Sequence, residues 1–477
     1  MSSSSIPSAL ISLVGVLRAA GHEVAVFNAD LFGAAYASDL DVLKGHDGYI
    51  QRLHNDSDPV WEVVRERLAA WKPDVVGVHV KTPSWAAGCR VARIAKEVSP
   101  ETMTVCGGPH VSCVPEDVRP ESGFDYGIAG EGEMALLRLV AASRDCERRG
   151  IGGVIRAGGN GDDWASPCEY VQKLDDLPFD GREALMDLDR YDKSGLGAVM
   201  TGRGCPFQCQ YCASHKIWTR RARFRSPENV AAELQLVKDK YGVTYFEFHD
   251  DTFTVNKDRA HRICDLIRGI GDLRWKCTTR ADCVDRELAE NMRASGCQEV
   301  SVGVESGSER ILASIQKGET KDDIRNGCEV LRAARIPFVA FIMIGFPTET
   351  EAEGWETASF AEALGADSLC GSVVTPYPGT KLYDWAQEAG RLPKKEDWSE
   401  YYHQSDGMGL WDLPPDHARS VIRAWFERVE KYNHRPSRLI KRFWSKFRSD
   451  PLGALHRSFS LIGGRLGKLA GRKKITA

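Results

Sequence analysis

Residues 202–212 read GRGCPFQCQYC and place thiols at Cys205, Cys209 and Cys212. A structural zinc site usually takes four ligands, so three thiols leave one ligand position unfilled. A cubane iron–sulfur cluster on three thiolates keeps its fourth iron open to a small molecule. The alternative is a zinc site that His215 or a distant thiol completes. Gly204 lets the backbone turn tightly beside either kind of metal centre.

The length, charge and cysteine content of the whole chain limit the kinds of protein in which this loop can occur. The chain has 477 residues, a formal net charge of -4 and 14 cysteines. Two or three domains are expected at this length, and the balanced charge gives no global footprint for nucleic acid. Scattered cysteines in a long chain do not resemble a secreted disulfide scaffold, which indicates a reducing cytoplasm. Cys277, Cys283 and Cys297 are expected to be small core residues.

Residues 6–142 alternate between helical and strand patterns. Helices are expected at 6–21, 59–71, 85–98 and 133–142, and strands at 23–29, 74–80, 102–108 and 124–130. This rhythm predicts an α/β fold with a doubly wound parallel sheet. Ligands of such sheets bind at the carboxyl ends of the strands, where Thr82, Gly107, Gly108 and His110 stand.

A change of composition separates two halves of the chain. Residues 143–195 are rich in glycine and aspartate, with a short strand pattern near 152–157 and an extended linker at 174–182. Strand–helix pairs then resume, and about six of them fall short of the eight of a full barrel. The predicted domains are a Rossmann-like domain at 1–142, a linker region at 143–195, a six-stranded partial (β/α)6 barrel at 196–385, a helical extension at 386–434 and a basic tail at 435–477.

The tail carries twelve Lys or Arg residues and one acid, Asp450. It is either a solvated, partly disordered tail or a contact for an anionic surface such as a membrane. No apolar run in the chain approaches the roughly 18 residues that cross a bilayer. The expected location is the cytoplasm, with peripheral membrane association through the tail.

The cysteine loop belongs to an ordered series of motifs at strand ends. After it come RSPENVAAEL (225–234), FHDDTF (248–253), TTRAD (278–282), GVESGSERIL (303–312), IGFPTET (344–350) and TPYPGT (375–380). CxxxCxxC with an aromatic residue before its last cysteine, followed by this series, resembles the radical S-adenosylmethionine (radical SAM) superfamily. The resemblance covers 196–385 and disfavours the zinc alternative.

The resemblance implies a 4Fe–4S cluster on Cys205, Cys209 and Cys212, whose open iron chelates SAM. One electron then cleaves SAM to methionine and a 5′-deoxyadenosyl radical. It further implies a set of SAM contacts. These are Asp250 and Asp251 for the methionine amine, Arg280 for its carboxylate, Glu305 for the ribose, Ile344, Gly345 and Phe346 for adenine, and Phe207 and Tyr211 as nearby walls.

Each polar member of that set also has a purely structural interpretation. Asp250 or Asp251 could cap the next helix, because Asp is a common N-cap residue. In this sequence His-Asp-Asp also replaces the Gly-Gly-Glu that is usual in the family. Arg280 could form a salt bridge at the barrel mouth, and Glu305, which precedes Ser-Gly, could be a turn residue.

The N-terminal half resembles the cobalamin-binding radical SAM subfamily, class B type. The matching stretches are LRAAGHEVAVFNA (17–29), DVVGVHVKTPS (74–84), VCGGPHVSCVPED (105–117) and DYGIAGEGE (125–133). The resemblance implies cobalamin contacts from Thr82, Ser84, Gly107, Gly108, His110, Gly130, Glu131 and Gly132. No Asp-x-His-x-x-Gly precedes Thr82, so no histidine from that motif is expected on cobalt. A Rossmann-like spacer without a ligand is the alternative.

One departure concerns the start of the sheet. Members of the subfamily have a strand ahead of the first helix, whereas only MSSSS precedes Ile6. The first, central strand is therefore expected to be missing, which leaves an apolar sheet edge uncovered. A misassigned start, a truncated chain and a domain that has lost cobalamin all remain open as explanations.

The paired domains indicate an enzyme, a cobalamin-dependent methyltransferase that acts on an unactivated carbon of a small molecule or lipid. Cyclisation, rearrangement or oxidation without methyl transfer is the first alternative, and a non-enzymatic metal- or cobalamin-binding regulator is the second. A methylthiolating enzyme would need a second three-cysteine cluster, whose pattern Cys89, Cys106 and Cys113 lack. The expected partner is an electron donor such as flavodoxin or ferredoxin, and nucleic acid is not expected.

Overall fold

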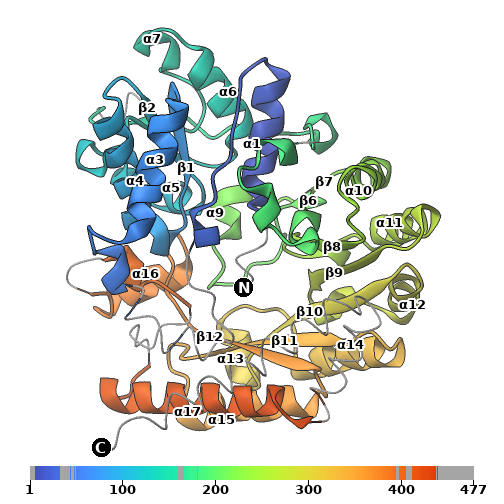
Figure 1. Cartoon of the computed structure of the whole chain (residues 1–477). Helices are drawn as coiled ribbons and strands as arrows, with labels where there is room; N and C mark the ends of the chain where they lie inside the picture. Colours follow the sequence, from blue (N-terminus) through green and yellow to red (C-terminus); the bar gives the residue numbers. More distant parts are fainter. Residues whose placement is uncertain are drawn as a thin grey trace, which may run out of the picture.

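The computed structural model of the chain describes residues 6–32, 43, 48, 50–159, 166–179, 181–393, 397–403, 411–436 and 438. Residues 1–5 and nearly all of the basic tail at 435–477 lie outside this described part. Two α/β regions follow one another along the chain and stand side by side (Figure 1). Within the described residues, no helix is both long enough and apolar enough to cross a membrane.

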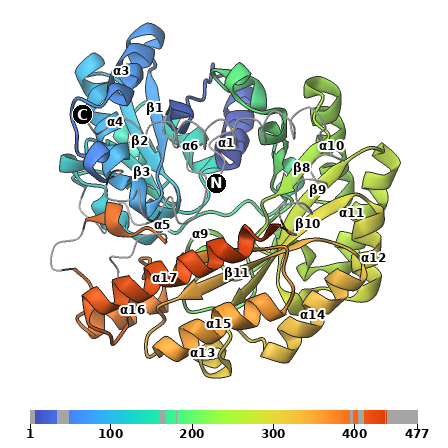
Figure 2. The same cartoon turned by 60° about the horizontal axis from the view of Figure 1, so that its bottom comes forward.

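The N-terminal region contains a four-stranded sheet in the order β1-β2-β3-β4. Strands β1 to β3 are parallel and β4 is antiparallel. Helices α3 and α4 lie on one face, and α1 and α6 lie on the other (Figure 2). The elements are α1 (Ser8–Ala19), α3 (Pro59–Trp71), β1 (Val75–His79), α4 (Trp85–Val98), β2 (Met103–Gly107), α5 (Pro109–Cys113), β3 (Tyr126–Ile128), α6 (Glu133–Ala141), α7 (Asp145–Arg148) and β4 (Val154–Arg156). The Rossmann-like prediction is confirmed.

The strand expected at 23–29 is wrong. Val26 makes an isolated parallel bridge with Leu185, donating to Ala184 O at 2.7 Å and accepting from Met186 N at 2.9 Å. A β-strand is defined by a series of backbone hydrogen bonds to a neighbouring strand. This segment makes such bonds on one side only, and only at Val26. β1 is accordingly an edge strand of the described sheet.

The second region contains a parallel sheet in the order β12-β11-β10-β9-β8-β5, which confirms the six-stranded partial barrel. Its elements are β5 (Ala198–Val199), β6 (Gly202–Arg203), α9 (Ser214–Trp218), β7 (Arg223–Phe224), α10 (Pro227–Tyr241), β8 (Tyr245–Phe248), α11 (Lys257–Ile270), β9 (Arg274–Thr279), α12 (Arg286–Ala294), β10 (Cys297–Glu305), α13 (Glu309–Ser314), α14 (Lys321–Ala333), β11 (Phe338–Ile344), α15 (Glu351–Ala363) and β12 (Ser368–Val373). The strands alternate buried and half-buried residues, so one apolar core fills the space between sheet and helices.

The helical extension follows as α16 (Lys381–Glu388) and α17 (Pro415–Asn433). Helix α17 buries Trp425 and Phe426 in the barrel core, and Asn433 pairs with both backbone groups of Leu369 on β12. Between α16 and α17, Trp398 reaches the N-terminal region, where its indole donates to Asp117 at 2.5 Å. The extension therefore ties the barrel to the N-terminal sheet.

Candidate functional site

The cysteine loop is held at its base by a two-stranded antiparallel ribbon, β6 and β7. Gly204 has a φ of +86°, and a Cβ there would lie 2.7 Å from Arg221 O, so the first turn of the loop requires glycine. Cys205, Cys209 and Cys212 follow, all partly exposed and without disulfides. Burial is the main cause that raises the pKa of the Cys212 thiol to about 12, and the neighbouring Cys209 and Cys205 add to it. The three thiols thus stand on one short loop between β6 and α9.

Two aromatic residues of the loop contact the barrel mouth. The Arg280 guanidinium lies over the Phe207 ring at 3.7 Å from its centroid. Tyr211 meets Phe346 edge to face, with ring centroids 6.1 Å apart. The structure therefore brings the predicted walls of the SAM site beside the ends of β9 and β11.

The two aspartates after β8 have different surroundings. Asp250 is buried and accepts hydrogen bonds from the backbone and side chain of Thr201, and burial raises its pKa. Asp251 accepts from Ser214 in α9, directly after the cysteine loop. Neither caps a helix, because Asn256 caps α11. Asp250 supports the strand before the loop, while Asp251 lies beside the loop itself.

Five charged residues, all buried except Asp282, form a group that meets the cysteine loop where Arg280 lies over Phe207. Arg280 forms a two-pronged pair with Asp282 at 3.0 and 2.8 Å and donates to Lys317 O at 2.7 Å. Lys317 stands 3.5 Å from Glu305 and 3.3 Å from Glu319. Burial lowers the pKa of Lys317, but these carboxylates outweigh it and leave the pKa above its usual value. The salt-bridge interpretation of Arg280 is confirmed, and Lys317 and Glu319 are members that the sequence did not indicate.

Glu305 and Gly345 end two neighbouring strands in left-handed conformations. Glu305 has a φ of +62° at a register shift of β10, a conformation that costs a non-glycine residue about 1–3 kcal/mol. Gly345, with a φ of +97°, and Phe346 donate their N–H groups to Glu349 at 2.6 and 3.1 Å. The Trp411 indole donates to the same carboxylate at 3.1 Å. Buried Glu349, absent from the predicted set, therefore fixes the loop after β11.

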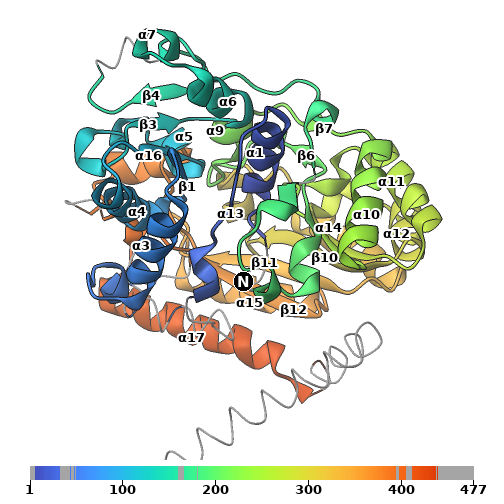
Figure 3. The ribbon, with the colours of Figure 1, turned by 45° about the horizontal axis from the view of Figure 1, so that its top comes forward.

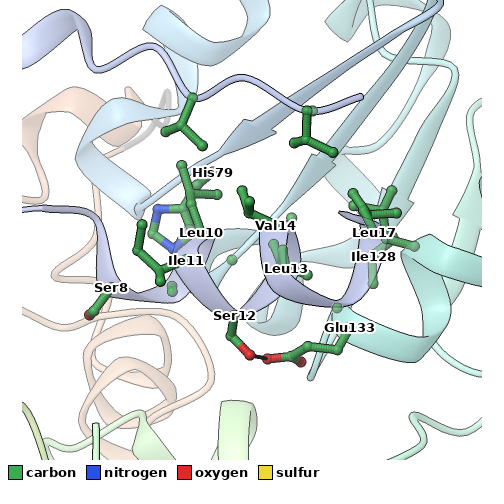
Figure 4. Close-up of a pocket in the computed structure, with 18 of the residues that line it drawn as sticks. Ser8, Leu10, Ile11, Ser12, Leu13, Val14, Leu17, His79, Ile128 and Glu133 are labelled. Carbon is green, nitrogen blue, oxygen red and sulfur yellow. Dashed lines mark hydrogen bonds between the residues drawn. The ribbon is translucent and has the colours of Figure 1, made fainter. Parts of the chain in front are cut away.

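The glycines predicted for cobalamin stand where β2 and β3 end. A Cβ on Gly108 would lie 2.8 Å from Val80 O, and one on Gly130 would lie 2.9 Å from the Cys168 side chain. Gly107, Gly108, Gly130, Glu131 and Gly132 all line one cavity of about 750 Å³, which α1 covers (Figure 4). Parallel sheets bind ligands at the carboxyl ends of their strands, so the predicted glycines lie together at a position where a ligand can bind.

The other three predicted cobalamin residues lie outside that cavity's lining. Thr82 is buried in a short 3-10 turn, and Ser84 exchanges hydrogen bonds with Lys81. His110 is fully buried, bonded to Asp117 at 3.1 Å and packed against Trp398. His110 thus sits in the contact with the C-terminal extension, where the described structure gives it a packing role.

Buried ion pairs join the glycine loop to the cysteine loop. Arg203 on β6 contacts Glu131 at 3.1 Å and Glu133 at 2.6 Å, and Arg223 on β7 contacts Glu131 at 2.7 Å. Ser12 of α1 adds a hydrogen bond to Glu133 at 2.8 Å. Both arms of the ribbon that carries the thiols therefore hold the acids of the Gly-Glu-Gly-Glu turn. The sequence did not indicate Arg203 and Arg223, although Arg203 stands only two residues before Cys205.

This geometry defines a class: a partial barrel with a three-thiol loop, coupled to a cobalamin-binding-type sheet. Comparison with protein-family models agrees, since residues 199–361 match the radical SAM superfamily and residues 4–140 match the B12 binding domain. An uncharacterised methyltransferase from Pyrococcus horikoshii, PH0819, is 34% identical over 389 residues, covering 80% of this chain and 84% of that protein. The chain therefore belongs to the radical SAM superfamily, in the family whose members carry an N-terminal B12-binding domain.

Other relatives and solved structures are more distant. A cytidylyl-2-hydroxyethylphosphonate methyltransferase from Streptomyces wedmorensis is 26% identical and covers 85% of this chain and 83% of its own. An anaerobic magnesium-protoporphyrin IX monomethyl ester cyclase from Rubrivivax gelatinosus is 28% identical, and the match covers 74% of this chain and 64% of that protein. The methyltransferase TsrM from Kitasatospora setae shares the fold, with a TM-score of 0.67 at 18% identity over 91% and 88% of the two chains.

Membership brings three cofactors: a 4Fe–4S cluster, SAM and cobalamin. The described residues fit them. The three thiols are free on a loop that only glycine can turn, as a three-thiolate cluster requires. Buried Glu349 Oε1 has no hydrogen-bond partner in the described structure, next to the predicted SAM residues. The glycine-lined cavity supplies an open cradle at the sheet edge.

Proposed function

We propose that this chain is a cobalamin-dependent radical SAM methyltransferase that acts on an unactivated carbon of a small molecule or lipid. The observation that carries the proposal is the clamp between Arg203, Arg223 and the acids Glu131 and Glu133. It joins a predicted cluster loop to a predicted corrin edge by buried contacts. When bound, the cofactors supply a substrate radical and a transferable methyl group. The P. horikoshii relative, named a methyltransferase, supports the same reaction.

The residues divide this work. Cys205, Cys209 and Cys212 would hold the cluster, and Phe207 and Tyr211 would wall the SAM site. Arg280 engages three of its five N–H groups with Asp282 and Lys317, and its Nη2 also stands 3.5 Å from Glu319. The second N–H of Nη1 would therefore be the donor to the methionine carboxylate. Asp251 would face the methionine amine. Asp250, turned to Thr201, would act through the strand instead.

Glu305 and the β11 loop would complete the SAM site. The left-handed backbone of Glu305 stores strain at the strand end, where its carboxylate would take the ribose hydroxyls. Ile344, Gly345 and Phe346 would meet adenine through backbone groups that Glu349 aligns. On the other side, Gly107, Gly108 and the turn Gly130–Glu131–Gly132 would approach the corrin, and Thr82, Ser84 and His110 would support that edge.

An anaerobic assay of the reconstituted protein tests the proposal. SAM, a low-potential reductant and a substrate library should yield both 5′-deoxyadenosine and S-adenosylhomocysteine. A visible spectrum should show corrin bands beside the broad cluster absorption. If neither SAM product forms with a loaded cluster, the proposal fails.

Radical cyclisation or rearrangement without methyl transfer is the second candidate, because the R. gelatinosus relative is named a cyclase. Formation of 5′-deoxyadenosine without S-adenosylhomocysteine would favour it.

Flavodoxin or ferredoxin would serve as the electron donor, which reduction of the cluster by each protein would show. Contact of residues 435–477 with anionic lipid would appear as binding to phosphatidylserine vesicles that salt reverses.

A further inference from the structure

The carboxylate of Glu305, the residue proposed to take the ribose, is turned back along its own strand. A Cβ on Gly303 would lie 2.5 Å from Glu305 Oε1 and 2.9 Å from Lys317 Nζ. Both distances are shorter than a side chain tolerates, so a methyl group at this position would push the two charged groups away. Gly303 of β10 therefore makes the space in which Glu305 and Lys317 meet.

Lys317 lies deeper in the barrel than Glu305. The Glu305 side chain keeps 12% of its surface exposed, whereas Lys317 keeps 4% and Glu319 keeps 0%. Of these three side chains, Glu305 is thus the one that reaches the open side. A ligand that enters the proposed SAM site would meet Glu305 first, with Lys317 behind it.

The contacts of the Lys317 ammonium are long. Its Nζ stands 3.5 Å from Glu305 and 3.3 Å from Glu319. Charge-assisted hydrogen bonds of this kind measure about 2.7–2.9 Å, so Lys317 is shared between two carboxylates and engages neither fully. An ionised carboxylate accepts at about four lone-pair sites. Glu305 therefore keeps most of its acceptor capacity for other donors, such as ribose hydroxyls.

A strained turn presents Lys317 to the interior. The residue stands between Gln316 and Gly318, whose φ angles are +52° and +72°. The turn joins α13 to α14 of the barrel (Figure 3). A left-handed residue other than glycine is strained, and exchanging a buried ion pair for apolar residues is often neutral or stabilising. The chain thus holds a buried cation at a place where stability alone does not call for one.

The backbone of Lys317 holds the other polar residue proposed for SAM. Arg280 donates from Nη1 to Lys317 O at 2.7 Å. The same guanidinium lies 3.7 Å from the ring centroid of Phe207 in the cysteine loop. The side chain of Lys317 thus contacts Glu305, and its carbonyl contacts Arg280. One residue links the groups proposed for the ribose and for the methionine carboxylate.

We propose that Lys317 is a positioning residue of the SAM site: its ammonium orients Glu305 toward the ribose hydroxyls, and its carbonyl fixes Arg280 for the methionine carboxylate. The inference rests on the proposed function and adds a residue that acts through its neighbours without touching SAM. Because Glu305 is more exposed and lies in front, the geometry favours this role over direct contact between Lys317 and the carboxylate.

The test measures how tightly the protein with its reconstituted cluster binds three ligands. These are SAM, its 2′,3′-dideoxy analogue, which lacks both ribose hydroxyls, and decarboxylated SAM. Lys317→Met should weaken binding of SAM and of decarboxylated SAM about tenfold or more, because both carry the hydroxyls, and leave the dideoxy analogue within about twofold. Lys321→Met, at a cation of α14 that pairs with Glu356, is the matched control and should change none of the three affinities.

The pattern across the ligands decides between positioning and the other roles of Lys317. Equal weakening of all three ligands would mean general damage to the site, and unchanged binding of decarboxylated SAM would mean direct contact with the carboxylate. Either result overturns the proposal, as does a wild-type affinity that ignores the hydroxyls. Failure of the proposed methyl transfer looks different: the wild-type protein would bind the ligands with the expected pattern but form no S-adenosylhomocysteine.

Gly303→Ala perturbs the same pair without removing a charge, and it remains informative if Lys317→Met does not fold. The added methyl group would displace Glu305 Oε1 and Lys317 Nζ from their contact. The variant should therefore lose affinity for SAM and for decarboxylated SAM but not for the dideoxy analogue. A folded Gly303→Ala protein that binds SAM as tightly as wild type would contradict the proposal.

Discussion

The barrel and the N-terminal sheet both present loops at the carboxyl ends of parallel strands, but they fix these loops by different means. The barrel uses its own residues: Lys317 faces the carboxylate of Glu305, and Glu349 holds Gly345 and Phe346. The glycine turn of the N-terminal sheet is held from outside, by Arg203 and Arg223 of the barrel. The corrin-type edge therefore depends on the barrel, whereas the barrel site has internal supports.

The largest effect is expected within the barrel. Cys209→Ser removes one of three thiolates and should abolish the cluster absorption near 400 nm and lower 5′-deoxyadenosine formation by about a thousandfold or more. Cys146→Ser, at an exposed thiol outside the loop, is the matched control and should leave both unchanged. A Cys209→Ser protein that keeps its cluster spectrum would remove the thiol from the ligand set.

The next largest effect is expected at the contact through which the barrel holds the glycine turn of the N-terminal sheet. Glu131→Gln takes the charge from a buried carboxylate that faces both Arg203 and Arg223, and an uncompensated buried charge costs about 3–5 kcal/mol. Denaturant unfolding should show this loss. Cobalamin affinity should fall more than cluster content, because the cysteine loop keeps its own glycine turn. Equal losses of both cofactors would contradict the asymmetry.

The barrel was predictable because its signals are local and repeated. Ser226 before Pro227 marks a helix start, and Ser226 does accept from Asn229 N at 3.2 Å. Alternating apolar residues mark each strand, and the thiol spacing marks the loop. The segment 23–29 has the same alternation, yet it forms no strand, because a strand needs a neighbour that the described residues do not place beside it.

The residues that hold the loops could not be predicted from the sequence for a different reason. Lys317 and Glu349 are ordinary charged residues in their local context, and only the fold buries them against strand ends. His110 follows a glycine pair, which favours a ligand contact, yet Trp398 comes from 288 positions further along and covers it. Long-range partners of this kind leave no local pattern.

A smaller effect concerns pH. Burial raises the pKa of Glu349 from 4.5 to about 7. Because the folded pKa lies above the unfolded one, its stabilising contribution is full below pH 4.5 and is lost as pH rises through 7. Glu349→Gln cannot titrate, so the difference in unfolding free energy between wild type and variant should change across that interval and stay flat above it. Glu351→Gln, at an exposed partner of His417, is the control, and a flat difference for Glu349→Gln would contradict the assignment.

The smallest effect uses the same chemical change as Glu131→Gln at the surface. Glu169 pairs with Arg138 of α6 through two contacts of 2.8 Å, and the two side chains are 51% and 49% exposed. Water already screens such a pair, so Glu169→Gln should cost less than about 1 kcal/mol and should not alter cobalamin affinity. Both measurements use the denaturant series and titration applied to Glu131→Gln. If the two variants lose equal stability, burial does not explain the strength of the clamp, and the difference between an edge held from outside and a self-supported site disappears.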